Sequence, residues 1–273
     1  MTTADGSAKL TTFHLDDEQK AQLLRRSFIF RGLDGKLLGR LARLSQTHRV
    51  PAGGLLCQQG EEGDALYAIA EGLVRVWVSS DGGKELTLLL LEPGDVFGEI
   101  ALLDGLPRSA SVEAVEDSLL VMVRREAFLP LLEAESGLAR HVIELLCERL
   151  RESTKRESEF AFLTLPARLA LKLQSLAIAH GHDEADGSVR ISLKLSQGEL
   201  AQMLGVTREA VNKQLKIWMQ ENLVRHEHGQ FVITDRHRLA AIGEGHDMAG
   251  RMSVARVRKA DRLEPRDRAR PAP

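Results

Sequence analysis

Between residues 48 and 125, glycine-containing turns divide the chain into short runs of Val, Leu and Ile, which limits the folds open to it. Within one run, Val74, Val76 and Val78 occupy every second position, so that they would share one face of a strand. Short strands at regular spacing with glycine-rich turns are typical of an antiparallel sandwich or barrel. We therefore predict a jelly roll over this segment. The turns that separate the runs lie at residues 71–72, 81–83 and 93–95.

From Phe128 onwards the spacing is that of helices. Along residues 143–160, one set of positions recurs three and four apart, which is a heptad spacing with a polar middle. The spacing alone favours a surface helix packed on its own domain. The alternative is a helix that pairs with a second copy of the chain and carries hydroxyl groups on its seam. The repeated positions are Ile143, Leu146, Leu150, Ser153, Glu157 and Phe160.

Residues 196–218 have the pattern of a helix-turn-helix. Ser196 and Glu199 form a capping box that begins a helix, and Gly205 ends it because glycine adopts positive φ easily. Thr207 then caps a second helix. The residues of that helix expected to face inward are Ala210, Val211, Leu215 and Trp218.

The outward face of this second helix carries polar groups that can read DNA. Arg can donate two hydrogen bonds to guanine, and a carboxylate can accept one from cytosine N4. Three packed helices without a role in DNA binding are the alternative, but Arg208 and Glu209 at the exposed end of the helix argue against it. Residues 224–233 alternate around His228-Gly229, which predicts a hairpin wing. The predicted DNA contacts are Thr207, Arg208, Glu209, Asn212, Lys213 and Lys216.

The stretch VFGEIALLDGLPRSASV, residues 96–112, places Glu99 and Arg108 on either side of an apolar turn, each beside a small residue. An arginine makes charge-assisted hydrogen bonds to a phosphate. We predict that this stretch forms a pocket for a small phosphorylated ligand. The alternative is a structural salt bridge between Glu99 and Arg108 in a domain that binds no ligand.

Both halves together resemble the Crp–Fnr family of bacterial transcription regulators, over roughly residues 28–243. FGEIALLDGLPRSA is similar to the phosphate-binding cassette of that family, and GVTREAVNKQLKIW is similar to its recognition helix. The resemblance implies an α+β fold with a cyclic-nucleotide-binding jelly roll, a long dimerisation helix and a winged helix-turn-helix. The implied segments are an N-terminal segment at 1–27, the jelly roll at 28–132, the dimerisation helix at 133–162, the winged helix-turn-helix at 163–243 and a basic tail at 244–273.

The resemblance also implies which residues hold the ligand. Arg108 and Ser109 would bind the cyclic phosphate, and Glu99 would accept a hydrogen bond from the ribose 2′-hydroxyl. Ser153 and Thr154 align with two hydroxyl residues that meet adenine in the family's cAMP readers, one from each subunit. We therefore expect cAMP. Those readers more often have Thr before Ser, whereas this chain has Ser before Thr, so cGMP stays open as the ligand. The full set of predicted ligand residues is Gly98, Glu99, Ile100, Ala101, Arg108, Ser109, Ser153 and Thr154.

Other functions find little support in the sequence. No nucleophile–base pair and no metal motif appears, so we expect neither an enzyme nor a metal site. The loop at 180–188 is rich in His, Asp and Glu, but such acidic loops are usually solvated. Cys57 and Cys147 are isolated, which fits a reducing cytoplasm, and the iron–sulfur sensors of the family need N-terminal cysteines that residues 1–50 lack. No apolar run is long enough for a membrane span.

The sequence therefore predicts a cytoplasmic homodimeric transcription regulator that binds a cyclic nucleotide, DNA and, as a further partner, RNA polymerase, but no membrane. Two alternatives stay open. One is a regulator of the same family that needs no ligand, and the other is an enzyme-regulatory cyclic-nucleotide module, which would need no recognition helix. Residues 251–273 hold eight Arg or Lys against three acids, and we expect a disordered tail, with contact to DNA phosphate as the alternative.

Overall fold

The computed structural model describes residues 11–244, so the predicted tail at 251–273 lies outside the described residues. The described residues divide into two compact units, with the boundary between Glu152 and Ser153. The fold is α+β, as predicted: a β-rich first unit, one long helix and a helix-turn-helix unit. Among the described residues, no helix has both the length and the apolar character needed to cross a membrane.

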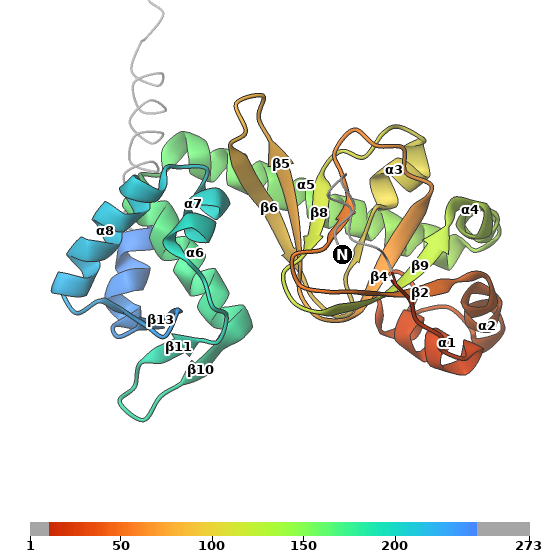
Figure 1. The fold of residues 1–273 in the computed structure, drawn as a ribbon, viewed down its shortest axis with the longest axis horizontal. Coiled ribbons are helices and arrows are strands. Elements are labelled where there is room, and N and C mark those ends of the chain that lie inside the picture. Colours follow the sequence, from red (N-terminus) through yellow and green to blue (C-terminus); the bar gives the residue numbers. More distant parts are fainter. Residues whose placement is uncertain (1–10, 245–273) are drawn as a thin grey trace, which may run out of the picture. The chain divides into compact units, whose positions relative to one another are not determined.

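The first unit contains two antiparallel sheets that enclose a shared core (Figure 1). One sheet has the strand order β1-β2-β9-β4-β7 and the other has the order β3-β8-β5-β6, which confirms the predicted jelly roll. Side chains from both sheets meet in the core, among them Tyr67, Val74 and Leu120. The strands are β1 (Thr11–Thr12), β2 (Gln46–Val50), β3 (Leu55–Cys57), β4 (Ala65–Glu71), β5 (Val74–Ser79), β6 (Glu85–Leu91), β7 (Val96–Phe97), β8 (Ser111–Ala114) and β9 (Ser118–Arg124).

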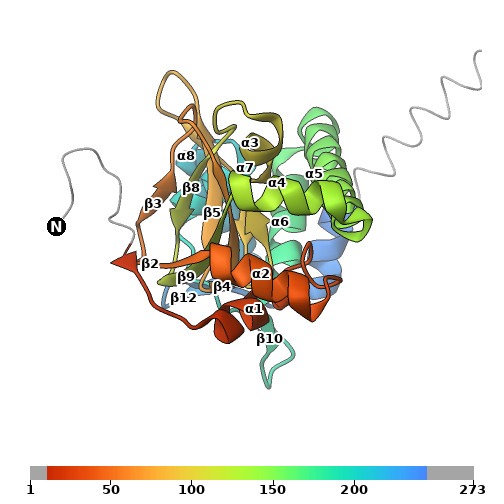
Figure 2. The same ribbon diagram turned by 90° about the vertical axis from the view of Figure 1, so that its right-hand side faces the viewer.

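A second core joins the outer face of the first sheet to the helices of this unit. Phe30 and Phe128 meet edge to face in that core, with their ring centroids 6.1 Å apart. Helices α1 and α2 lie side by side beneath it (Figure 2). Each begins directly after an aspartate, Asp16 or Asp34, whose carboxylate accepts a main-chain N–H of the first turn. The helices are α1 (Asp17–Arg26), α2 (Gly35–Leu44), α3 (Glu99–Asp104), α4 (Arg125–Ala134) and α5 (Ser136–Phe162).

Helix α5 begins at Ser136, three residues later than the predicted start at 133, because α4 extends to Ala134 and Glu135 has extended backbone. Its start lies in the first unit and its end in the second. The side chains that it buries in the first unit are Leu138, Val142 and Leu145, which lie outside the predicted heptad seam, whereas the seam residue Leu146 is half-buried against the same core.

The second unit contains a four-stranded antiparallel sheet with the order β10-β11-β13-β12, and the predicted helix-turn-helix. Ser196 Oγ accepts from the Glu199 N–H at 3.1 Å, and the Glu199 carboxylate accepts from the Ser196 N–H at 2.7 Å. Gly205 ends the first helix with a φ of 61°. The elements are α6 (Leu165–His180), β10 (Gly181–Asp183), β11 (Val189–Ile191), α7 (Gln197–Leu204), α8 (Arg208–Gln220), β12 (Val224–Glu227) and β13 (Gln230–Ile233), followed by helical residues 236–244.

The predicted wing is the hairpin of β12 and β13. Its two turn residues both have positive φ, 53° at His228 and 82° at Gly229, which suits a two-residue hairpin turn.

Candidate functional site

Arg108 follows the cassette helix α3 and is one of the few buried charged residues, with 7% of its surface exposed. Its Nη1 donates to the main-chain oxygen of Gly98 at 3.0 Å, and its Nη2 donates to that of Ala65 at 2.8 Å. Its Nε is buried and has no hydrogen-bond partner. The guanidinium is therefore fixed in direction by two carbonyls, while its buried Nε–H is left without an acceptor.

Two glycines make room for this guanidinium. A Cβ atom at Gly63 would lie 2.5 Å from Arg108 Nε, and one at Gly98 would lie 2.5 Å from Arg108 Nη1. Gly98 also has a φ of 83°, which side chains rarely adopt, and it immediately precedes α3. Neither position can therefore carry a side chain while Arg108 keeps this place. The sequence predicted a role for Gly98 but missed Gly63, since the contact of Gly63 is distant in sequence.

Glu99 is buried at the start of α3, with 6% of its surface exposed. Burial raises the pKa of Glu99, and the positive charges of Arg149 and Arg108 oppose that change. No ion pair joins Glu99 to Arg108 within residues 11–244, so the structural salt bridge that was the alternative is absent there. The carboxylate is held out of water without a dedicated cation.

Arg149 on α5 is a residue that sequence reasoning missed. Its Nη2 donates to the main-chain oxygen of Val96 at 3.0 Å, and its Nε is buried without a partner. It thereby ties α5 to the strand that leads into the cassette, and its positive charge lowers the pKa of Glu99 more than the charge of Arg108 does. Its position one turn after Leu145, on the stripe that α5 buries, was the available signal.

The side of Arg108 that faces the interior of the jelly roll meets an aromatic pair and a thiol. Tyr67 stacks on Phe97 with ring centroids 5.0 Å apart, and Arg108 Cζ lies 6.0 Å from the Tyr67 ring. Burial raises the pKa of Cys57 to about 11, an effect that the nearby Arg108 charge reduces. Cys57 is therefore a protonated, apolar part of this wall.

The other predicted ligand residues occupy different surroundings. Ser109 is exposed beside Arg108, Ala101 is buried in α3, and Ile100 is 42% exposed. Ser153 is half-buried and Thr154 is exposed, both on the part of α5 that belongs to the second unit. The structure thus brings Gly98, Glu99 and Arg108 together, whereas the two hydroxyl residues are part of the other unit.

Helix α8 presents the predicted DNA contacts. Thr207 caps it by accepting the Ala210 N–H at 3.3 Å. Its apolar face is buried at Val211, Leu215 and Trp218, as predicted, whereas Ala210 is half-buried. The predicted contacts are exposed at Thr207, Arg208, Glu209, Lys213 and Lys216 and half-buried at Asn212.

Glu209 is poised to stay ionised at the start of this helix. A hydrogen bond from its own main-chain N–H and one from Thr207 lower the pKa of Glu209. A carboxylate at a helix N-terminus is also favoured by the helix dipole.

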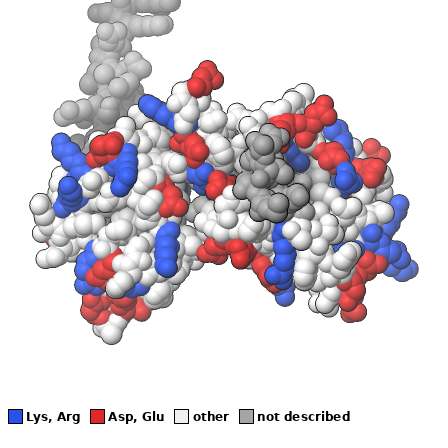
Figure 3. Space-filling model, viewed as in Figure 1, with Lys and Arg blue, Asp and Glu red and all other residues white. Residues whose placement is uncertain are grey.

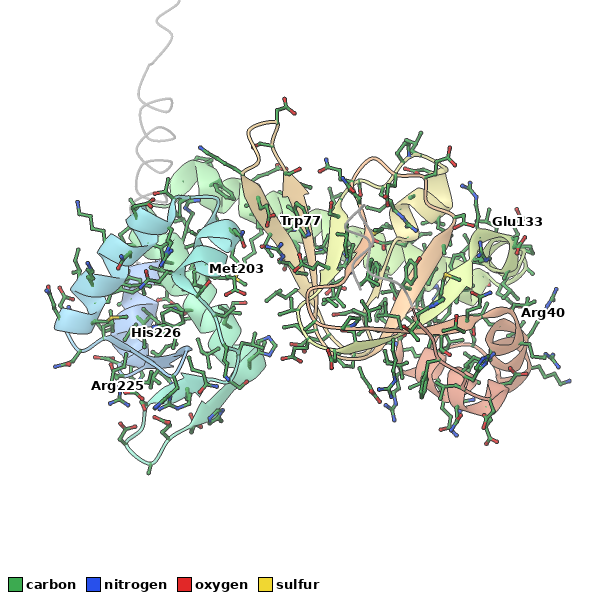
Figure 4. The ribbon with its side chains drawn as sticks, in the orientation of Figure 1. Arg40, Trp77, Glu133, Met203, Arg225 and His226 are labelled. Carbon is green, nitrogen blue, oxygen red and sulfur yellow. The ribbon has the colours of Figure 1, made fainter. Side chains whose placement is uncertain are left out.

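Acidic residues of the loop at 180–188 form ion pairs with arginines of the four-stranded sheet β10-β11-β13-β12. Arg190 pairs with Glu184 at 2.5 Å and with Glu227 at 2.8 Å, and Arg225 pairs with Asp186 at 3.3 Å. Figure 3 shows basic and acidic atoms side by side on this part of the second unit, and Figure 4 labels Arg225. In the part of the chain that the structure describes, no group of His, Cys, Asp and Glu could hold a metal ion.

Two family descriptions match the chain. "Cyclic nucleotide-binding domain" matches residues 47–135, and "Crp-like helix-turn-helix domain" matches residues 167–242. The first covers the cassette and the second covers α7, α8 and the wing.

Relatives of known name are similar over nearly their whole length. The chain is 31% identical over 219 residues to a CRP-like cAMP-activated global transcriptional regulator of Mycobacterium tuberculosis, covering 80% of the chain and 97% of the relative. It is 34% identical over 202 residues to a cyclic AMP receptor protein of Thermus thermophilus, covering 74% and 90%. A solved CRP/FNR-family transcriptional regulator of Thermus thermophilus is 32% identical, with a TM-score of 0.62 over 73% of this chain and 99% of that one.

Proposed function

The chain belongs to the Crp–Fnr family of transcription regulators, and we propose that it acts as a homodimer whose binding to DNA is controlled by cAMP. The two matched domains make it a cyclic-nucleotide-responsive, DNA-binding regulator rather than an enzyme.

The unused donor of Arg108 is the observation that carries the proposal. A buried N–H without a partner costs free energy, and a phosphate oxygen of a bound nucleotide would supply the acceptor that Arg108 Nε lacks. A cyclic phosphate carries one negative charge and oxygen atoms that accept strongly. In the proposal, Arg108 Nε donates to a phosphate oxygen, and the exposed Ser109 hydroxyl beside it donates to another.

Glu99 serves the ribose in this proposal. The buried carboxylate accepts a hydrogen bond from the 2′-hydroxyl. This bond replaces one that the carboxylate loses to water on folding. This contact disfavours 2′-deoxy ligands and also 2′-phosphates, which would put a second anion beside a carboxylate. Arg149 holds the cassette strand through Val96 and keeps a positive charge within reach of Glu99.

Ser153 and Thr154 read the base in this proposal. Both carry hydroxyl groups on α5, Ser153 on the heptad stripe and Thr154 directly after it, and both can donate to and accept from a purine. The names of two relatives, a CRP-like cAMP-activated regulator of Mycobacterium tuberculosis and a cyclic AMP receptor protein of Thermus thermophilus, support adenine as the base.

The outward stripe of α5 supports the homodimer. Ile143 is 60% exposed, Leu150 is 67% exposed and Phe160 is 44% exposed, although all three are large and apolar. They lie at the heptad positions, while Leu138, Val142 and Leu145 pack on the first unit. A second copy of α5 would bury the exposed stripe as a coiled coil.

The exposed front of α8 supports specific DNA binding. In the proposal Arg208 takes a guanine, Glu209 takes the cytosine of a neighbouring pair, and Lys213 makes a weaker guanine contact because it lacks the planar fork of arginine. Because these residues resemble the Arg-Glu-x₃-Arg reader of the family, a dimer would prefer two inverted half-sites similar to TGTGA, about one helical turn apart. RNA polymerase is a further proposed partner.

Calorimetric titration of the full chain with cAMP and with cGMP tests the ligand. We expect tighter binding of cAMP. Equal or stronger binding of cGMP would contradict the base assignment, and no binding of either would contradict the proposal that a cyclic nucleotide is the ligand.

Selection of binding sites from random duplexes, with and without cAMP, tests the proposed DNA contacts of α8. An unrelated or non-palindromic motif would contradict the assignments on α8 and the dimer.

A further inference from the structure

An arginine in the first turn of α6 contacts two other helices of the second unit. Arg168 Nη1 donates to the main-chain oxygen of Leu204 at 3.1 Å, and Arg168 Cζ lies 4.5 Å from the centre of the Phe160 ring. Phe160 belongs to α5, and Leu204 is the last residue of α7. A single guanidinium therefore connects the end of α5, the start of α6 and the end of α7.

The carbonyl that Arg168 binds lies directly before the turn of the helix-turn-helix. A helix leaves its last carbonyls without partners within the helix. The N–H groups of Gly205 and Val206 both donate to Ala201, so they do not satisfy Leu204. Arg168 supplies that donor, and a positive charge at this end of α7 is also favoured by the helix dipole. The side chain thus helps to fix where α7 stops and α8 begins.

The surroundings hold Arg168 in one place. Its Nε is buried and unpartnered, and burial lowers the pKa of Arg168 while Glu159 opposes that change. The face of an aromatic ring attracts a cation, so Phe160 replaces part of the water that the guanidinium loses. A loosely held surface arginine would keep its Nε in contact with water.

We propose that Arg168 is a positioning residue that transmits the arrangement of α5 to the DNA-reading helices. Helix α5 is continuous, and Phe160 follows Ser153 by about two turns. If a bound nucleotide shifts α5, the Phe160 ring moves with it. The guanidinium that rests on the ring then pulls on Leu204 and on the turn before α8. This inference rests on the proposed function, because it assumes that the nucleotide acts through α5.

The test compares DNA binding with and without cAMP in the full chain. Arg168→Met removes the charge and the donor but keeps the length of the side chain. Phe160→Leu removes the ring but keeps an apolar side chain at this position of the proposed dimer stripe. Arg236→Gln is the matched control, because Arg236 is an exposed arginine of the same unit that pairs with Asp183. Fluorescence anisotropy on the duplex recovered by site selection gives the DNA affinity, and calorimetry gives the cAMP affinity.

We expect the cAMP-induced gain in DNA affinity to fall at least fivefold in Arg168→Met and Phe160→Leu, while the cAMP affinity stays within twofold of wild type. Arg168→Lys should keep part of the gain, and Arg236→Gln should keep all of it. Because the Phe160 ring is 44% exposed, Phe160→Leu should fold even if Arg168→Met does not. Equilibrium sedimentation checks that both variants have the oligomeric state of wild type.

Other results would overturn the inference. Equal losses of DNA affinity with and without cAMP would indicate a structural role only. An unchanged gain in both variants, in protein that binds cAMP normally, would remove the role of Arg168 and leave the proposed function intact. A wild-type protein whose DNA affinity does not respond to cAMP would overturn both.

Discussion

The cassette and the recognition helix both use an arginine and a glutamate, but they place them in opposite surroundings. Arg108 and Glu99 are buried, at 7% and 6% exposed. Arg208 and Glu209 are exposed at the start of α8. In the cassette, carbonyl groups and glycines fix the guanidinium. On α8, only the helix fixes the backbone, and the side chains reach into solvent.

The difference follows from what each pair has to recognise. A small anion can be enclosed, so its partners can be fixed in advance, and each contact gains strength from the low dielectric around it. A DNA duplex cannot be enclosed, so the side chains that contact its bases have to be exposed to solvent in the free protein. Loss of a cassette charge should therefore cost more binding free energy than loss of a charge on α8.

Arg108→Ala should produce the largest effect. We expect cAMP affinity to fall by about 2–5 kcal/mol, because the cation meets the phosphate in a buried place. Calorimetry measures this loss directly. Arg124→Ala is the matched control, since Arg124 lies nearby in sequence but forms an exposed pair with Asp64 at 2.7 Å.

The control should bind cAMP as wild type does. Because Arg108 also satisfies the carbonyls of Gly98 and Ala65, the melting temperature of Arg108→Ala is measured alongside. Wild-type affinity in a folded Arg108→Ala protein would show that the phosphate binds elsewhere.

Arg208→Ala should produce a smaller and more selective effect on DNA. We expect a loss of about 1–3 kcal/mol that relaxes the preference at one base pair. Lys216→Ala sharpens the comparison, because Lys216 is exposed further along α8, where we expect contact with phosphate. That variant should weaken all sequences alike. Competition binding against a set of single-base variants of the selected site measures both effects, and a uniform loss in Arg208→Ala would remove its base contact.

Glu99→Gln tests the other buried charge of the cassette. It should weaken the rejection of 2′-deoxy-cAMP, because an amide oxygen accepts less strongly than a carboxylate. It should also stabilise the ligand-free protein at neutral pH, on the order of 1 kcal/mol, because it removes a buried charge. Calorimetry with both nucleotides and urea unfolding measure the two effects. Unchanged rejection of the deoxy ligand would contradict the ribose contact.

The raised pKa of Glu99 gives the wild-type protein a pH dependence with a definite sign. An acid whose pKa is raised on folding contributes full stability below its unfolded pKa and loses it as the pH rises through the folded pKa. The affinity for the ligand should instead increase as the pH rises, because the 2′-hydroxyl donates its hydrogen bond to the ionised carboxylate. The cAMP affinity of wild type should therefore fall as the pH drops through the raised pKa of Glu99, and that part of the pH profile should be absent in Glu99→Gln.

The two regions also differ in how far the sequence could predict them. The boundaries of α7 and α8 depend on Ser196, Glu199, Gly205 and Thr207, which act on neighbours within a few residues. Such local signals are visible in a sequence. The jelly roll was predictable for the same reason, because its turns are marked by glycine.

The cassette was predictable only in part, because its contacts are distant along the chain. Arg108 is paired with the carbonyl of Ala65, and Arg149 with that of Val96, 43 and 53 positions away. Gly63 is needed because Arg108 passes over it. No spacing rule relates such residues. Similarly, the heptad of α5 identified a stripe but could not show that its large apolar residues Ile143, Leu150 and Phe160 are exposed while a neighbouring stripe packs on the first unit.

Replacing both hydroxyl groups of α5, Ser153→Ala with Thr154→Ala, should give the smallest effect and the most specific one. The two nucleotides share the phosphate and the ribose, which Arg108 and Glu99 bind in the proposal, so cAMP should still bind. They differ only in the base, and one neutral hydrogen bond contributes about 0.5–1.5 kcal/mol. The ratio of cAMP to cGMP affinity should therefore fall by roughly three- to tenfold, while the loss in cAMP affinity stays well below that of Arg108→Ala. Thr154→Ser, which keeps the hydroxyl, should retain the ratio. Equal discrimination before and after the double change would mean that the base is read by other residues, and the buried cassette would then have to recognise the whole nucleotide without help from α5.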